Sequence, residues 1–259
     1  SFSVSPFMVF TDEMLTWPPD PDAWSLRWYK NMIGNCSADV VSSTVPCSNK
    51  WMIGTVNSFF IGFVATFIAT TLGTLAALGL SRPHMPYKGL IMAILISPMI
   101  VPLIITAAGM FFFYARINLV YSFTGIILAH VALATPFVVI TVTATLVGFD
   151  MNMVKASQSL GARPVRTFFK VIMPLILPGV ISGALFAFIT SFDEVVIVMF
   201  MASLDQLTIP KQMWAGIRQE ISPVILCMAT CLVILSILLL TTVELLRRRS
   251  EKLRGIKSR

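Results

Sequence analysis

The chain has 259 residues, of which 56% are hydrophobic and only 12% are charged. Soluble globular domains carry about 25% charged residues, so this composition excludes an ordinary soluble domain and indicates an integral membrane protein. The net charge of +7 does not indicate a nucleic-acid partner, because the basic residues gather beside apolar runs rather than in a phosphate-binding stripe.

Residues 1–52 are polar and rich in turn-forming residues, and no apolar run among them reaches the roughly 20 residues of a spanning helix. Their aromatic side chains suit a segment along the membrane–water interface or, equally, a folded loop with its own small core. Cys36 and Cys47 lie in this segment. They are a candidate disulfide if the segment is exported to an oxidising compartment, and two separate thiols otherwise.

Five apolar runs long enough to cross a bilayer follow, at residues 53–80, 90–114, 120–147, 174–202 and 223–246. Prolines interrupt the second run (Pro98 and Pro102) and the third (Pro136), which predicts kinked helices. His130, in the third run, is expected to hydrogen-bond a neighbouring helix. The predicted fold class is therefore all-α and membrane-integral, with a transmembrane domain at residues 53–246.

The distribution of Lys and Arg predicts the orientation. Thirteen of the 19 basic residues lie in the loop after the first run, the 148–173 loop and the tail at 247–259. The positive-inside rule places these segments in the cytoplasm and residues 1–52 in the periplasm. Five spans with an exported start are an odd number, and the chain does not open with Met. We therefore expect a further spanning helix before Ser1.

Asp193 and Glu194 stand out as adjacent carboxylates late in the fourth apolar run. Acidic side chains in a membrane span usually face a bundle interior or an aqueous path, because facing lipid costs a few kcal/mol. Along a path they would favour a cationic solute. The alternative is a structural pair that bonds a neighbouring helix or caps the next loop.

The 148–173 loop is longer than a connection between spans requires, and residues 151–173 are compatible with helix. Ala156, Gly161 and Pro174 fall on the fixed positions of the "EAA" loop of bacterial ATP-binding-cassette importer permeases, which this loop resembles; Lys155 stands at the Glu position. The resemblance implies that the loop docks on an ATPase subunit and couples its motion to the membrane helices. The implied coupling residues are Lys155, Ala156, Ser157, Ser159, Leu160, Gly161, Ala162 and Arg163.

A longer string is similar to the spermidine/putrescine permease family. It includes 159–162, 178–179, 182–184, the Ser191-Phe192-Asp193-Glu194 motif and residues 213–218. The resemblance implies a type I importer permease bundle with a solute pathway near that motif. It further implies a docking site for a periplasmic binding protein in the 203–222 loop, at Trp214, Arg218 and Glu220. Within that loop, residues 210–223 could form a short amphipathic helix, for which simple anchoring at the interface is an equal alternative.

This family implies a multi-pass protein of the bacterial inner membrane. Its partners would be a second permease, an ATPase dimer, a periplasmic solute-binding protein and membrane lipid. No phosphate-binding loop occurs in the sequence, so we expect ATP and Mg²⁺ to bind the ATPase and this chain to hold no cofactor or metal. Polyamines are the expected solute; opines, aminophosphonates and γ-aminobutyrate stay open. A stand-alone ion-coupled carrier and an intramembrane enzyme are alternatives of other classes, and neither explains the 151–173 loop.

Overall fold

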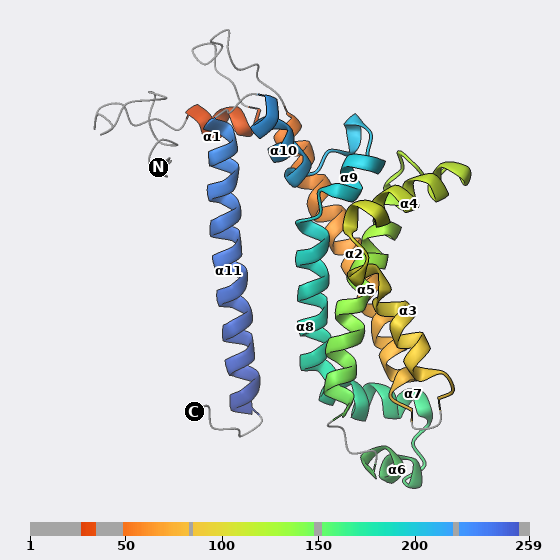
Figure 1. The fold of residues 1–259 in the computed structure, drawn as a ribbon. Coiled ribbons are helices and arrows are strands. Elements are labelled where there is room, and N and C mark those ends of the chain that lie inside the picture. The colour runs from red at the N-terminus through yellow and green to blue at the C-terminus, as the bar shows by residue number, and fades with distance from the viewer. Residues whose placement is uncertain (1–26, 35–48, 83–84, 148–151, 220–222, 254–259) are drawn as a thin grey trace. The chain divides into compact units, whose positions relative to one another are not determined.

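The computed structural model describes residues 27–34, 49–82, 85–147, 152–219 and 223–253, and the regular elements among them are helices (Figure 1). These residues divide into two compact units. The first takes in the described residues within Ser1–Met52 and Met213–Arg259, and the second takes in those within Ile53–Gln212.

The core of the second unit is built from α2 (Lys50–Leu80), α5 (Phe123–Val147) and α8 (Met173–Phe192). Figure 1 shows α5 and α8 running side by side. Helices are the expected element, since within a bilayer a helix satisfies its own backbone hydrogen bonds. The outward side chains of α2 are large and apolar, among them Phe67, which is 75% exposed. An apolar outer surface of this kind is typical of a helix that faces lipid.

The second apolar run folds as two helices, α3 (Lys88–Ile100) and α4 (Leu103–Arg116), whose axes are bent by 102°. Val101, between them, is extended with φ −72° and ψ 135°. The ring of Pro102 excludes the helical region for the residue before it. The kink expected at Pro102 is therefore present, and it is sharp enough to separate the run into two helices, whereas Pro98 and Pro136 lie inside α3 and α5.

The segment that precedes α8 contains α6 (Asn152–Ser159), α7 (Pro164–Thr167) and a π turn, Phe168–Ile172. α7, the π turn and α8 form one continuous helical stretch, Pro164–Phe192. Pro174 follows the 151–173 segment without ending the helix. It enters in the first turn of α8, where its missing N–H costs no helical hydrogen bond.

The fourth predicted span, 174–202, is wrong at its far end. α8 stops at Phe192, and α9 (Val196–Met201) starts after a break at 193–195. Because the residues of α9 are also apolar, the apolar run continues past the break and predicted a single span. A 3₁₀ turn, Leu204–Gln206, and α10 (Ile209–Gln219) follow. α10 confirms the short helix expected between residues 210 and 223.

In the first unit, α1 (Arg27–Met32) packs against α11 (Pro223–Leu253). Tyr29 and Met32 contact the buried Val224 and Cys227. α11 continues seven residues beyond the predicted end of the fifth span, into the basic tail. Among the described residues, three helices are long and apolar enough to cross a membrane, and the bent α3–α4 pair makes a fourth if it is one span.

Candidate transport site

The end of α8 is fixed against α5 by small side chains. Gly179, Gly183, Ala187 and Ser191 are all buried and recur every four residues, so they lie on one face of α8. The last of them, Ser191, hydrogen-bonds His130 Nδ1 of α5 over 2.8 Å. His130 therefore joins two helices, as expected. Small residues let helix backbones approach closely, and this stripe positions everything that follows Ser191.

Phe192 lies on a different face of α8, among aromatic rings. Its ring centroid is 5.2 Å from that of Phe59 on α2 and 5.4 Å from that of Phe188. Aromatic pairs at such separations contribute about 0.5–1.5 kcal/mol beyond their buried area. Phe192 thus packs α8 against α2, and the structure places both Phe192 and Ser191 in helix contacts.

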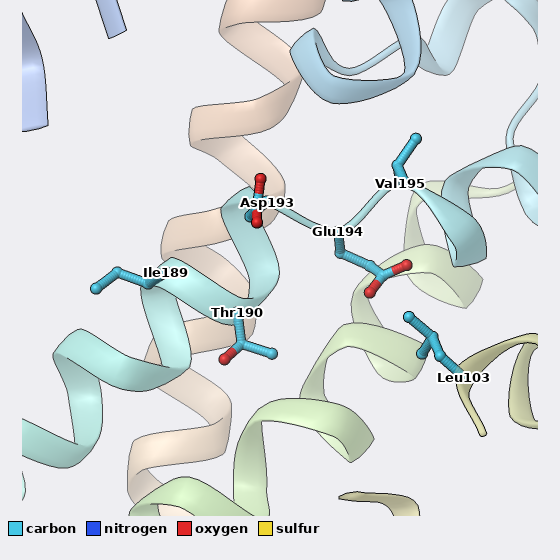
Figure 2. A pocket seen from close by; sticks show the side chains of 6 residues that line it. All are labelled: Leu103, Ile189, Thr190, Asp193, Glu194 and Val195. Carbon is cyan, nitrogen blue, oxygen red and sulfur yellow. The ribbon is translucent and has the colours of Figure 1, made fainter. Parts of the chain in front are cut away.

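A cavity of about 360 Å³ opens where α8 ends. Figure 2 shows its six lining residues, which come from α8, from the break after it and from the start of α4. They are Leu103, Ile189, Thr190, Asp193, Glu194 and Val195. The break in the helix is what brings two adjacent carboxylates into one wall, since neighbouring residues of a continuous helix point about 100° apart.

The two carboxylates occupy different environments. Asp193 is exposed, whereas Glu194 is buried, with 7% of its surface accessible. Glu194 Oε1 accepts a hydrogen bond of 2.9 Å from the backbone N–H of Ile197, in the first turn of α9. In Figure 2 the Glu194 side chain points toward Leu103. Glu194 thus caps the N-terminus of α9, and Asp193 is the carboxylate that is exposed at the cavity.

Sequence reasoning named Asp193 and Glu194 as pathway residues, and the structure brings both to this cavity. It did not name Leu103, Ile189, Thr190 or Val195, which line the cavity with them. Leu103 comes from a helix about 90 residues earlier in the chain, and apolar residues in an apolar span carry no signal of their own. Only Thr190 could have been found from the sequence, because it is a polar residue directly before the Ser191–Glu194 motif.

The second candidate site is the segment around α6. Gly161 has a φ of +77°, a conformation that suits glycine. Its N–H bonds Gln158 O over 2.9 Å, and the N–H of Ala162 bonds Ser157 O over 3.1 Å. This bond pair is a Schellman motif, which ends a helix abruptly. Gly161 therefore fixes the point where α6 stops and the chain turns.

The predicted coupling residues separate into two groups. Ser157 turns inward, where its hydroxyl bonds the buried Thr167 of α7 over 3.0 Å, and Ala162 is half-buried. The remaining six are exposed: Lys155, Ala156, Ser159, Leu160, Gly161 and Arg163. Leu160 is 88% exposed, and Val165 and Phe169 on the following turns are 69% and 62% exposed. The segment thus presents apolar side chains between cationic ones.

Residues 69–252 match the family model described as the inner membrane component of binding-protein-dependent transport systems. This match covers more than half of the chain. The chain belongs to this family.

Several relatives of the permease are named for polyamines. It is 28% identical to the spermidine/putrescine transport system permease PotC of Haemophilus influenzae, over 88% of this chain and 84% of the relative. PotC of Escherichia coli K12 is 30% identical over 73% and 72%. The putrescine permease PotI of the same strain is 28% identical over 80% and 72%.

A solved structure of the MetNI methionine ABC transporter in an inward-facing conformation matches the fold. Its TM-score is 0.55 at 21% identity, and the match covers 79% of this chain and 95% of that chain. This likeness supports an all-α permease fold, and the family model with the sequence relatives makes the chain a type I ABC importer permease, in the group that contains the spermidine/putrescine permeases. It is a multi-pass protein of the inner membrane, and the comparisons do not favour a stand-alone carrier.

α10 carries two of the three residues expected to meet a binding protein. Trp214 is 47% exposed and Arg218 is exposed, whereas Glu220 lies outside the described residues. Lys211, on the first turn of α10, is half-buried, and burial lowers the pKa of its ammonium group because the charged form loses water. Its Nζ donates to Ala202 O over 3.0 Å and to Val198 O over 3.3 Å, at the end of α9.

Two further expectations concern cysteines and metals. Cys36 and Cys47, the candidate disulfide, lie outside the described residues. Within the described ranges, no group of three His, Cys, Asp or Glu side chains is placed to hold a metal ion.

Proposed function

We propose that this permease translocates a small cationic amine of the spermidine or putrescine class, as one subunit of an ATP-driven importer. The observation that carries the proposal is the exposed carboxylate of Asp193 on a cavity at the break between α8 and α9. The relatives named for spermidine and putrescine support the same solute class.

The chemistry of the wall suits an ammonium group. A carboxylate in a cavity with low-dielectric walls raises the local concentration of cations. Charge-assisted hydrogen bonds to carboxylates contribute about 1.5–3 kcal/mol, enough to hold an amine without trapping it. Thr190 adds a hydroxyl acceptor, and Leu103, Ile189 and Val195 offer apolar contact for the methylene chain between two amines.

The α6 segment is the proposed docking site of the ATPase subunit, with residues 148–173 in the cytoplasm and residues 1–52 in the periplasm. ATP and Mg²⁺ bind to the ATPase dimer, which hydrolyses the ATP. The exposed apolar side chains of Leu160, Val165 and Phe169 suit a groove on a partner, since desolvated apolar anchors dominate interface energies. The exposed cationic side chains of Lys155 and Arg163 belong to the same segment and fit an acidic rim.

In this mechanism the permease alternates between two packings. Closure of the ATPase dimer moves the α6 segment, and α7 and α8 carry that movement along one helical stretch to Asp193. A second permease completes the pathway opposite the cavity wall. A periplasmic binding protein delivers the solute at α10, through Trp214 and Arg218. Hydrolysis then resets the complex, and packed helices switch between discrete arrangements.

ATPase activity of the purified complex in lipid tests the proposal. The loaded binding protein is added with spermidine, putrescine, γ-aminobutyrate or an opine, and we expect stimulation with a polyamine alone. Stimulation only by another solute would keep the importer and refute the polyamine. Failure to co-purify with an ATPase would refute the coupling.

A pair of variants at Gly161 isolates the docking step. A β-branched residue at a φ of +77° costs about 1–2 kcal/mol and unwinds the end of α6, whereas Asn tolerates this conformation. We expect Gly161→Val to lower the stimulated ATPase rate about tenfold and Gly161→Asn to leave it near that of the unaltered complex. Equal rates would show that the end of α6 does not transmit the coupling.

A further inference from the structure

The segment from the last residue of α9 to the first residue of α10, residues 201–209, is held to α2 by a buried amide. Asn57 of α2 has 9% of its surface exposed. Its Nδ2 donates to Asp205 O and to Leu207 O, each over 3.0 Å. The neighbouring Ser58 Oγ accepts the N–H of Ile209 over 2.8 Å. Both N–H groups of the Asn57 amide are therefore donated in hydrogen bonds to a segment about 150 residues later in the chain. We call residues 201–209 the latch segment.

The same segment is held to the α4–α5 loop from its other side. Gln206 lies between the two carbonyls that Asn57 binds, and its Nε2 donates to Tyr121 O over 2.9 Å. Its Oε1 accepts the N–H of Ser203 over 3.2 Å. The Gln206 side chain is buried. The backbone carbonyls of Asp205 and Leu207 thus bind α2, and the side chain of Gln206 between them binds the α4–α5 loop. These three consecutive residues connect α2 to that loop.

Tyr121 is held in a left-handed backbone conformation by these bonds. Its φ is +60°, which costs a residue with a β-carbon about 1–2 kcal/mol. Its N–H donates to Met201 O over 2.9 Å, and its carbonyl accepts from Gln206. Such a conformation persists only where surrounding contacts determine it. Here both backbone polar groups of Tyr121 are bonded to the latch segment.

The latch segment continues directly from α9, and α9 begins at the cavity. A carboxylate, Glu194, binds the N-terminal turn of α9, and an ammonium group, Lys211, binds its last carbonyls. Both charges complement the helix dipole. Because α9 spans only six residues, whatever fixes its last residue, Met201, also fixes the Glu194–Val195 wall.

We propose that Asn57 is a positioning residue for transport. Through the latch segment and α9 it sets where the Glu194–Val195 wall stands, so that the wall moves with α2 and the α4–α5 loop as one body. This inference rests on the proposed function only in taking that wall as part of the solute path. Buried polar side chains in membrane spans are costly and are retained where they serve function.

The test uses Asn57→Asp in the assembled complex. This isosteric change replaces the double donor with an oxygen that faces two carbonyl oxygens. Asn118→Asp is the matched control, because Asn118 is exposed in the α4–α5 loop with a φ of +55°, which Asp tolerates. Asn57→Leu removes the donors without adding charge, and it replaces Asn57→Asp if that variant does not assemble.

A reporter cysteine, Val195→Cys, is introduced where the four native cysteines have been replaced by alanine. Its rate of labelling measures how firmly the Glu194–Val195 wall is held in place. We expect a membrane-impermeant maleimide to label it at least about fivefold faster in the Asn57 variants, and at an unchanged rate in Asn118→Asp. A second reporter, Ile176→Cys, replaces a fully buried residue near the other end of α8 and should stay unlabelled. An unchanged rate at Val195→Cys would overturn the proposal. Faster labelling at both reporters would also overturn it, because Asn57 would then support the whole fold.

ATPase activity completes the test. We expect the Asn57 variants to keep basal ATPase within about twofold while stimulation by the loaded binding protein falls at least about fivefold. A parallel fall of both rates would contradict a positioning role. If the unaltered complex responds to no polyamine-loaded binding protein, the proposed solute is wrong, while the labelling rates still decide the role of Asn57.

Discussion

Gly183 offers a quantitative test of the contact between α8 and α5. A β-carbon at this position would lie 2.5 Å from Thr141 Oγ1 and 3.0 Å from Val138 Cα. The hydroxyl can rotate away, but Val138 Cα belongs to the backbone of α5 and moves only with the helix. Overpacking of a tight core costs about 1–3 kcal/mol. Alanine is more favourable than glycine in a helix by up to about 1 kcal/mol, and this gain offsets part of the overpacking cost. Gly183→Ala is therefore expected to destabilise the permease by about 1–2 kcal/mol.

Gly109→Ala is the matched control, because Gly109 is also inside a helix and its β-carbon would meet no atom within 4 Å. This variant should gain up to about 1 kcal/mol. The two variants therefore differ by about 1–3 kcal/mol, which is roughly a fivefold to 150-fold difference in the unfolding equilibrium. The denaturation midpoint of each purified variant in mixed micelles measures this difference. Equal midpoints would refute the reasoning, since they would mean that α5 and α8 have room to separate.

Three further predictions concern the cavity and the bend. Asp193→Asn should raise the KM for spermidine roughly tenfold in proteoliposomes, through the loss of a charge-assisted hydrogen bond. Glu194→Gln keeps an acceptor for Ile197 N–H and should change stability little. A larger rise in KM for Glu194→Gln than for Asp193→Asn would exchange the roles of the two carboxylates. Ser191→Ala should cost about 0.6 kcal/mol, the average for a hydrogen bond between membrane helices; in a double-mutant cycle with His130→Phe, additive costs would contradict the pairing. Pro102→Ala should lengthen the distance between spin labels at Leu90 and Phe112, because Val101 regains the helical region, and an unchanged distance would show that packing alone holds the bend.

The elements set by local chemistry were predictable from sequence. The end of α6 follows from Gly161, because few residues adopt a positive φ without cost. The position of the α3–α4 bend follows from Pro102. The size of the angle does not, because packing against the neighbouring helices sets it. The His130 contact was predicted in kind, but its partner Ser191, 61 residues later, was not.

The break at 193–195 was missed because apolar composition is the main signal of a span and α9 is as apolar as α8. Two adjacent carboxylates were the available sign, since they cannot share one face of a continuous helix. The latch contacts were beyond reach for a different reason. Asn57 binds backbone carbonyls, and any residue at 205 or 207 would supply the same acceptors, so no sequence pattern records the pairing.

The length of α8 ties the permease to the thickness of its bilayer. Its 20 residues rise about 30 Å, which equals the hydrocarbon core of a typical membrane. With Met173 at one boundary of the hydrocarbon core, an upright α8 would place Asp193 at the opposite boundary between acyl chains and head groups, where its carboxylate can contact water. Longer acyl chains would draw that boundary past Asp193, and mismatch costs fractions of a kcal/mol per Å. Lipid chain length thus becomes a determinant of how readily the Asp193 carboxylate meets a cation from water.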